Sequence, residues 1–390
     1  MTFATLTLIC LVTLAGPVLA LPRRIGLPVI IGELAVGLVL GTSLLGWLDA
    51  SEHTFTFLAE VGFALVMFAA GTHVPVRNTA LRSGLARGAL RAVAVGALAV
   101  GAGCLIACVF DTGHAALYAV VLASSSAAIV MPILTEHPMT ARPIVEMLPQ
   151  IAIADAVCII ALPLVLDPAN APRVALGTVA VAVAAALLFV LLQWLESSGR
   201  RVRVHKVSED RALALELRTL LVALFGIAAL AVALHASVML AGFATGLAVA
   251  AWGEPKRVTK QIFALTEGLF GPIFFIWLGA SLDLRELVEH PAAIGLGFVL
   301  GVAAVLVHSV MVVTRQPFPV AAATASQLGV PVAAAALGGQ LGVLQPGEGT
   351  AFLLGALVTI AVTTVLSGRL AKLAQEKEDG EQAKSGTLQA

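Results

Sequence analysis

The stretch LPQIAIADAVCIIALPLVL, residues 148–166, sets a single carboxylate, Asp155, in the middle of an otherwise almost wholly apolar segment. This segment is long enough to cross a bilayer, since about 20 apolar residues in a helix span roughly 30 Å of hydrocarbon. A charge at the centre of a membrane helix costs roughly 2.5–3.5 kcal/mol even on the most lenient insertion scale. An acid in this position therefore indicates a functional site, and we expect Asp155 to bind an ion or a proton.

The composition of the whole chain extends this interpretation to a polytopic membrane protein. Of its 390 residues, 59% are hydrophobic and only 12% are charged, and the mean hydropathy is +1.00. A soluble domain does not have this composition, so we predict an all-α membrane protein. The net charge of zero gives no indication of a nucleic-acid partner. The sequence contains neither a G-x-x-x-x-G-K phosphate loop nor an H-E-x-x-H motif, so we expect no enzyme activity and no cofactor.

Hydropathy and charge together predict the topology. Thirteen spans are predicted, at residues 3–21, 28–47, 56–74, 88–110, 114–135, 145–166, 173–195, 214–234, 236–252, 262–281, 292–314, 317–343 and 349–371. With the N-terminus outside, only Arg173 and Arg285 of the 23 lysines and arginines fall outside, so the positive-inside rule places the C-terminus in the cytoplasm. We expect residues 1–371 to form the transmembrane domain and residues 372–390 to form a short disordered cytoplasmic tail.

Two predicted spans contain helix-breaking residues at matching places. The fifth span contains a serine triplet that includes Ser125 and Ser126, followed by Pro132, and the twelfth contains Gly329 and Pro331. Secondary transporters are commonly built from inverted repeats with broken helices at the binding site. The breaks lie about 205 residues apart, and an offset of seven spans reverses the direction of the chain. The sequence therefore predicts inverted repeats with two broken crossing helices, although Pro and Ser also occur in membrane helices for packing alone.

Five motifs occur along residues 1–371 in a characteristic order. They are GLPVIIGELAVGLVLG (26–41), LAEVG with FAAG (58–62 and 68–71), LPQIAIAD (148–155), AGFATG (241–246) and GPIFFIWLGASLDL (271–284). Together they resemble the monovalent cation:proton antiporter superfamily, in the Kef/NapA-type branch of the sodium/hydrogen exchanger family. Within them, the spacings Gly37-x-x-x-Gly41 and Gly242-x-x-x-Gly246 predict close contact between helices.

The resemblance implies an elevator-like exchange of Na⁺ or K⁺ for H⁺ across the cell membrane. It also implies a panel of helices that forms a homodimer, and a core in which two broken helices cross beside the acid. Three positions depart from the family pattern. Ala154 stands where relatives often have Asp, Asn or Gln, and His308 stands where many have lysine. The first break reads Ser125-Ser126-Ala127 in place of Thr-Ser-Pro or Thr-Asp-Pro.

The chemistry of exchange can be derived from the candidate residues themselves. Burial disfavours the charged form of a carboxyl group, so Asp155 can bind a proton or a cation, but not both well. The hydroxyls of Ser125 and Ser126, with carbonyls freed at the break, would supply oxygen ligands to an alkali cation. His308 would pair with Asp155, relay protons, or remain a neutral hydrogen-bonded histidine. We expect His308 to keep the same protonation state throughout the transport cycle, in which case exchange is electroneutral. If His308 instead releases a proton when the cation binds, two protons exchange for one cation.

Two other functions remain possible on the same scaffold. One is a gated potassium efflux channel, against which the lack of a soluble regulatory domain argues. The other is a transporter of an organic ion, against which the lack of lysine or arginine in any membrane core argues. The expected partners are therefore Na⁺ or K⁺, H⁺, membrane lipid and a second copy of the chain.

Overall fold

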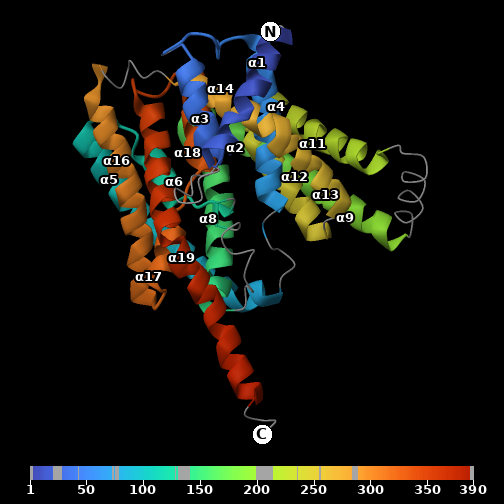
Figure 1. Cartoon of the computed structure of the whole chain (residues 1–390), viewed down its shortest axis with the longest axis vertical. Coiled ribbons are helices and arrows are strands. Elements are labelled where there is room, and N and C mark those ends of the chain that lie inside the picture. Colours follow the sequence, from blue (N-terminus) through green and yellow to red (C-terminus); the bar gives the residue numbers. More distant parts are fainter. Residues whose placement is uncertain are drawn as a thin grey trace. The chain divides into compact units, whose positions relative to one another are not determined.

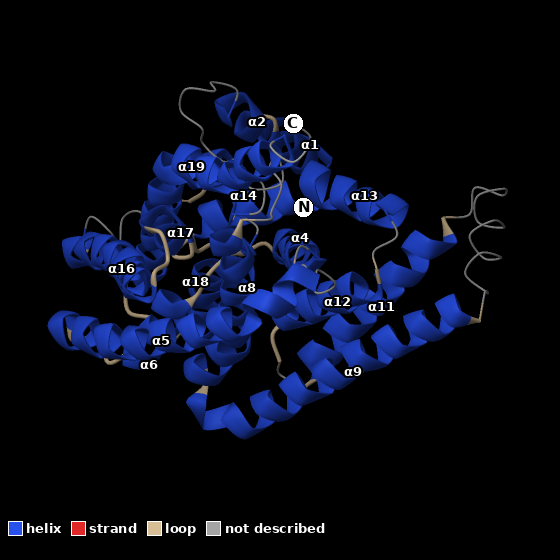
Figure 2. Cartoon of the chain, turned by 90° about the horizontal axis from the view of Figure 1, so that it is seen from below, coloured by secondary structure: helices blue, strands red, loops and turns tan. Residues whose placement is uncertain are grey.

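All regular secondary structure that the structure describes is helical, in agreement with the predicted class (Figure 2). The computed structural model describes residues 3–20, 29–42, 44–72, 74, 79–127, 129–130, 141–198, 214–234, 236–253, 256–282 and 289–386. Within them, eight helical segments are long and apolar enough to cross a membrane: His53–Thr72, Gly84–Phe110, Arg142–Leu166, Pro168–Ser197, Leu215–Ala233, Lys260–Ser281, Pro291–Thr314 and Glu348–Leu373. Shorter apolar helices occupy Leu6–Val18, Val238–Trp252 and Gly329–Leu341.

The chain divides into two compact units, each made of two separate segments. The first unit comprises Met1–Arg77 and Asp167–Arg285, and the second comprises Asn78–Leu166 and Glu286–Ala390. Asp155 and all the other predicted site residues belong to the second unit.

The first unit is an assembly of helices, most of them apolar (Figure 1). Its helices are α1 (Phe3–Thr13), α2 (Ala15–Ala20), α3 (Val29–Leu40), α4 (His53–Thr72), α9 (Ala171–Ser197), α11 (Leu215–Ala233), α12 (Val238–Trp252), α13 (Lys256–Leu265) and α14 (Gly271–Ser281). A π-helical turn, Thr266–Phe270, joins α13 to α14. The closest packing is between α4 and α12 and between α3 and α14.

Glycines make these two close contacts possible. A Cβ atom on Gly37 of α3 would overlap the backbone oxygen of Ile276 in α14, and one on Gly246 of α12 would overlap that of Phe68 in α4. The helices therefore touch backbone to backbone, which a larger residue would prevent. This confirms the close helix contact predicted from the two glycine spacings.

The second unit contains two helical segments that are interrupted by non-helical residues. Its elements are α5 (Thr79–Phe110), α6 (Ala115–Ala123), α8 (Arg142–Leu166), α16 (Pro291–Ser309), η3 (Val310–Thr314), α17 (Phe318–Ala323), α18 (Gly329–Leu341) and α19 (Glu348–Gly386). Helix α6 ends before the non-helical residues 124–126, and residues 324–328 separate α17 from α18. In chain order, both halves of this unit therefore read helix, broken helix, helix.

The two interruptions lie close to the predicted positions. The first includes Ser125 and Ser126, while Pro132 lies outside the described residues. In the second, Gly329 and Pro331 begin α18 directly after the interruption. Proline is tolerated in the first turn of a helix, where its missing N–H has no intrahelical partner. The helix therefore stops before these two residues and restarts at them.

The structure differs from the expected disordered tail. Helix α19 continues beyond the predicted span, as far as Gly386. The segment after residue 372 is rich in Ala, Glu, Gln and Lys, which are good helix formers. The polar composition of this segment does not prevent the last helix from continuing.

Candidate functional site

A direct hydrogen bond joins the two interruptions of the second unit. The hydroxyl of Ser125, directly after α6, donates to the backbone carbonyl of Thr324, directly after α17, with an Oγ···O distance of 2.6 Å. Both residues are buried, as is Ser126 in the same interruption. The structure thus brings a serine predicted from sequence against the second break, 199 residues further along the chain.

Asp155 lies in α8, which packs against α5, α6 and α18 within the second unit. Its side chain is buried, with 5% of its surface exposed. Among the described residues, its carboxyl group makes neither a hydrogen bond nor an ion pair. An ionised carboxylate buried without partners is strongly disfavoured, so this group requires either a bound proton or a bound cation. Ala154, beside it, is also buried and has no side-chain ligand atom to offer.

His308 contacts both interrupted helices. From α16, its Nδ1 lies 2.9 Å from the hydroxyl oxygen of Thr324, and its Nε2 lies 3.2 Å from the backbone oxygen of Leu122 in the last turn of α6. The ring is completely buried. Within the described part of the chain, His308 forms no ion pair with Asp155. Of the three roles expected for this histidine, the contacts fit the proton relay and the neutral hydrogen-bonded residue.

Three buried polar residues that sequence analysis did not single out extend this site. Gln150 of α8 donates to the Thr324 hydroxyl over 3.4 Å, and Gln316 donates to the Gln150 side-chain oxygen over 2.9 Å. All three, Gln150, Gln316 and Thr324, are almost completely buried. Each is an uncharged polar residue within or beside a predicted apolar span, which is a weaker signal than the charged carboxyl group that identified Asp155.

The second interruption is also anchored to α19. The Ser326 and Thr363 hydroxyls lie 2.5 Å apart, and the backbone N–H of Gln327 donates to the Thr359 hydroxyl over 3.2 Å. The second bond satisfies a backbone N–H within the interruption, and the first pairs two buried hydroxyls. Both bonds stabilise the break within the unit.

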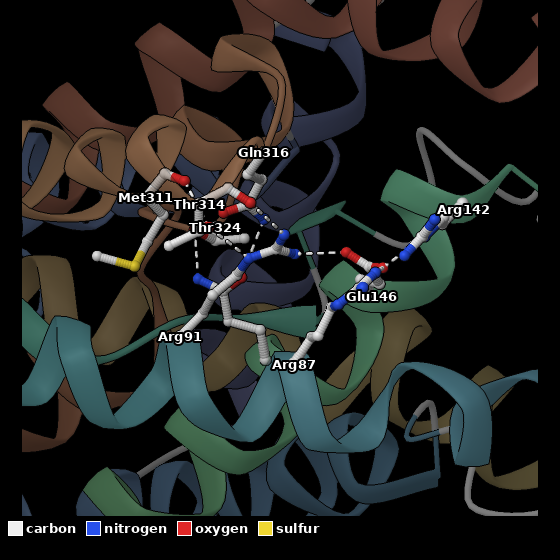
Figure 3. A network of polar contacts seen from close by, with 9 residues as sticks. Arg87, Arg91, Arg142, Glu146, Met311, Thr314, Gln316 and Thr324 are labelled. Atoms are coloured by element: carbon white, nitrogen blue, oxygen red, sulfur yellow. Dashed lines mark hydrogen bonds and ion pairs between the residues drawn. The ribbon is translucent and has the colours of Figure 1, made fainter.

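A network of charged groups lies near the start of α5 and α8 (Figure 3). The Glu146 carboxylate contacts Arg91 Nη1 at 3.0 Å, Arg87 Nη1 at 2.7 Å and Arg142 Nε at 2.9 Å. Arg91 also donates from Nε to the Thr314 hydroxyl over 2.8 Å, which connects α5 to η3. The side chain of Arg91 is only 4% exposed, whereas those of Arg87 and Arg142 are 55% and 69% exposed. In the sequence, these arginines contributed only to the overall charge bias that orients the chain.

A second cluster of polar groups, centred on Glu348, lies beyond the other end of α5. Glu348, the first residue of α19, is buried and receives a 2.5 Å hydrogen bond from the Tyr118 hydroxyl. Its carboxylate also lies 2.8 Å from His114 Nδ1, just before α6. Both clusters join the first half of the unit to the second. The polar contacts of this unit therefore extend from one end of its helices to the other.

An all-helical membrane unit with interrupted helices around buried polar groups is the arrangement that secondary transporters commonly have. The family model described as "Sodium/hydrogen exchanger, transmembrane" matches residues 8–372, and the chain belongs to this family. The match confirms the resemblance seen in the sequence, and it supports a multi-pass plasma membrane protein.

Curated relatives and solved structures agree with this assignment. The chain is 27% identical over 293 residues to the Na(+)/H(+)-K(+) antiporter GerN of Bacillus cereus, covering 72% of this chain and 71% of that protein. It is 28% identical over 291 residues to the glutathione-regulated potassium-efflux system protein KefC of Klebsiella pneumoniae, covering 72% of this chain but only 45% of that protein. The fold is similar to the sodium proton antiporter MjNhaP1 of Methanocaldococcus jannaschii, with a TM-score of 0.66, 14% identity and coverage of 96% and 97%.

Proposed function

We propose that this protein exchanges Na⁺ or K⁺ for H⁺ by alternating access, with Asp155 as the carboxylate for which the ions compete. The observation that carries the proposal is the burial of Asp155 without a hydrogen-bond or ion-pair partner among the described residues. A bound proton removes its charge and a bound cation balances it, and either state is less costly than the bare anion. Each time the site crosses the membrane, Asp155 therefore carries either one proton or one cation. This is the minimal scheme for antiport.

The first interruption supplies the remaining cation ligands in this proposal. Alkali cations prefer hard oxygen ligands, which Ser125, Ser126 and the carbonyls at the end of α6 provide. In the described state, Ser125 donates to Thr324 and so still has lone pairs available. The name of GerN mentions both Na⁺ and K⁺, and that of KefC mentions potassium, so both cations are candidates for this chain.

The broader architecture belongs to the same proposal. The order helix, broken helix, helix in both halves of the second unit supports an inverted repeat. We infer that this unit is the moving core and that the first unit is the panel which forms a homodimer. We retain thirteen spans with the N-terminus outside, because this arrangement places Arg87, Arg91 and Arg142 at or near the cytoplasmic ends of their helices.

Purified protein in proteoliposomes tests the exchange directly. An imposed pH gradient should collapse when Na⁺ or K⁺ is added to wild-type vesicles, and empty vesicles are the control. Cation flux without proton movement would favour the channel alternative. No response to either cation, with a response to an organic ion, would favour the third function.

The topology can be tested separately. Single cysteines at positions 205 and 385 should be protected from a membrane-impermeant thiol reagent in whole cells, whereas cysteines at 173 and 285 should react. The background must lack the four native cysteines. Labelling of position 385 from outside would refute the predicted orientation.

A further inference from the structure

The hydrogen-bond partners of His308 restrict where its protons can lie. The backbone oxygen of Leu122, 3.2 Å from Nε2, can only accept a hydrogen bond. This contact is therefore favourable only if Nε2 carries a proton. A neutral ring with its proton on Nδ1 would instead set two lone pairs against each other in a buried site.

The Thr324 hydroxyl has one proton and two acceptors within reach. Its oxygen lies 2.7 Å from the backbone oxygen of Ala321 and 2.9 Å from His308 Nδ1. If the hydroxyl donates to Nδ1, the ring is neutral and its proton is on Nε2. If it donates to Ala321, its oxygen can accept a proton from Nδ1, and the ring is then an imidazolium. Rotation about one C–O bond separates these two states.

The protonated state gains one hydrogen bond in this arrangement. It has bonds from Nε2 to Leu122, from Nδ1 to Thr324 and from Thr324 to Ala321, whereas the neutral state has only the first of these and the reverse bond from Thr324 to Nδ1. Gln150 can donate to Thr324 in both states, since the hydroxyl oxygen has two lone pairs. The added bond partly offsets the cost of burying the charge.

We propose that Thr324 is a positioning residue whose rotating hydroxyl allows His308 to bind a second transported proton at Nδ1. The proposal rests on the proposed antiport and refines its stoichiometry. The Thr324 hydroxyl turns from Nδ1 to Ala321, and the incoming proton, taken from water on the open side, bonds to the Nδ1 lone pair that this rotation releases. On release the proton returns to water and the hydroxyl turns back. With one proton on Asp155 and one on His308, two protons exchange for one cation, in place of the electroneutral cycle expected from sequence.

Other ionisable groups near α16 do not account for this behaviour. The elements that pack against α16 carry buried Arg91 on α5, Tyr118 on α6 and Glu348 on α19. Asp155 and Glu146 lie on α8, which packs against α5 and α6. None of these five forms a hydrogen bond or ion pair with His308 among the described residues. The ring is thus controlled by neutral oxygens, of which only the Thr324 hydroxyl can be changed by side-chain substitution.

The test compares Thr324→Val with Thr324→Ser in proteoliposomes on solid-supported membranes. Wild type should give currents after cation jumps, and Thr324→Ser should keep them. Thr324→Val, which loses the acceptor, should bind the second proton about tenfold more weakly, as for loss of a hydrogen bond to a charged group. Its currents should therefore require a pH about one unit lower. Thr364→Val is a matched control, because the Thr364 hydroxyl bonds only to Ile360 in its own helix.

Several outcomes would overturn the proposal and leave antiport intact. These are a wild type that collapses the pH gradient without current at any pH, a Thr324→Val variant with the wild-type pH profile, and currents that persist in His308→Gln. If Thr324→Val does not fold, Thr324→Ala removes the same hydroxyl without adding bulk. Failure of wild type to collapse a gradient with either cation would refute the proposed function instead.

Discussion

Both units of this protein contain glycines that bring helix backbones into close contact, but they differ in the polar contacts between their side chains. In the first, contacts such as Gly37 to Ile276 bring backbones together with no polar side chain involved. In the second, hydrogen bonds and ion pairs such as Ser125 to Thr324 and Arg91 to Glu146 join segments far apart in sequence. Buried polar groups are costly unless they are satisfied, whereas close apolar packing carries no such risk. Under the proposed function, the transport role of the second unit accounts for the polar groups that it retains.

The largest effect should follow from Asp155→Asn. The asparagine keeps the shape of the side chain but cannot titrate, so the competition between proton and cation ends. Exchange should fall to the level of empty vesicles while the protein still folds and inserts. Asp167→Asn is the matched control, because Asp167 lies just outside the predicted span and should leave exchange unchanged. Exchange at a near wild-type rate in Asp155→Asn would show that Asp155 is not the ion-binding site.

A large loss of stability should follow from Glu146→Gln. This change leaves Arg91, whose side chain is 4% exposed, without its counter-charge, and breaking a buried pair costs about 3–5 kcal/mol. Arg87→Ala is the control, because an exposed pair contributes only about 0–1 kcal/mol. Thermal unfolding in detergent measures both. Equal shifts of the unfolding temperature in the two variants would mean that burial of Arg91 does not determine the strength of the network.

A smaller loss is expected for Gly37→Ala in the first unit. The added Cβ would overlap the backbone of Ile276, and overpacking costs about 1–3 kcal/mol. Gly226→Ala in α11 is the matched control, since nothing lies within 4 Å of its Cβ position. That substitution should stabilise the helix by roughly 0.5–1 kcal/mol. If both glycines tolerate alanine equally, close backbone contact does not hold this unit together.

The smallest effect should come from Trp277→Phe, which removes one of the polar bonds of the first unit. The Trp277 indole N–H donates to the backbone oxygen of Ala50 over 2.9 Å. Its loss should cost about 1 kcal/mol in thermal unfolding. Trp47→Phe, at an exposed position, should change nothing. A cost as large as that of Glu146→Gln would contradict the contrast between the units.

Several parts of the candidate site could be predicted because their signals are local. Asp155 stands out as a charge in an apolar span, and the serines before Pro132 and the Gly329 and Pro331 pair mark places where a helix cannot continue. His308 was found by its position in the family pattern. Thr324, Gln150 and Gln316 were missed, because a single uncharged polar residue in a span gives a weak signal until its partners are known.

The sequence by itself determined that this is an all-helical membrane protein of the exchanger family, with Asp155 in the middle of one span and helix-breaking residues in two others. These properties depend on hydropathy and on helix-breaking residues, which act over one or two turns. Only the tertiary structure decided which polar groups meet: His308 contacts Thr324 and Leu122, and Glu146 gathers three arginines. The physical reason is that partners such as Ser125 and Thr324 lie 199 residues apart in the chain, and only packing of the helices brings them within hydrogen-bonding distance.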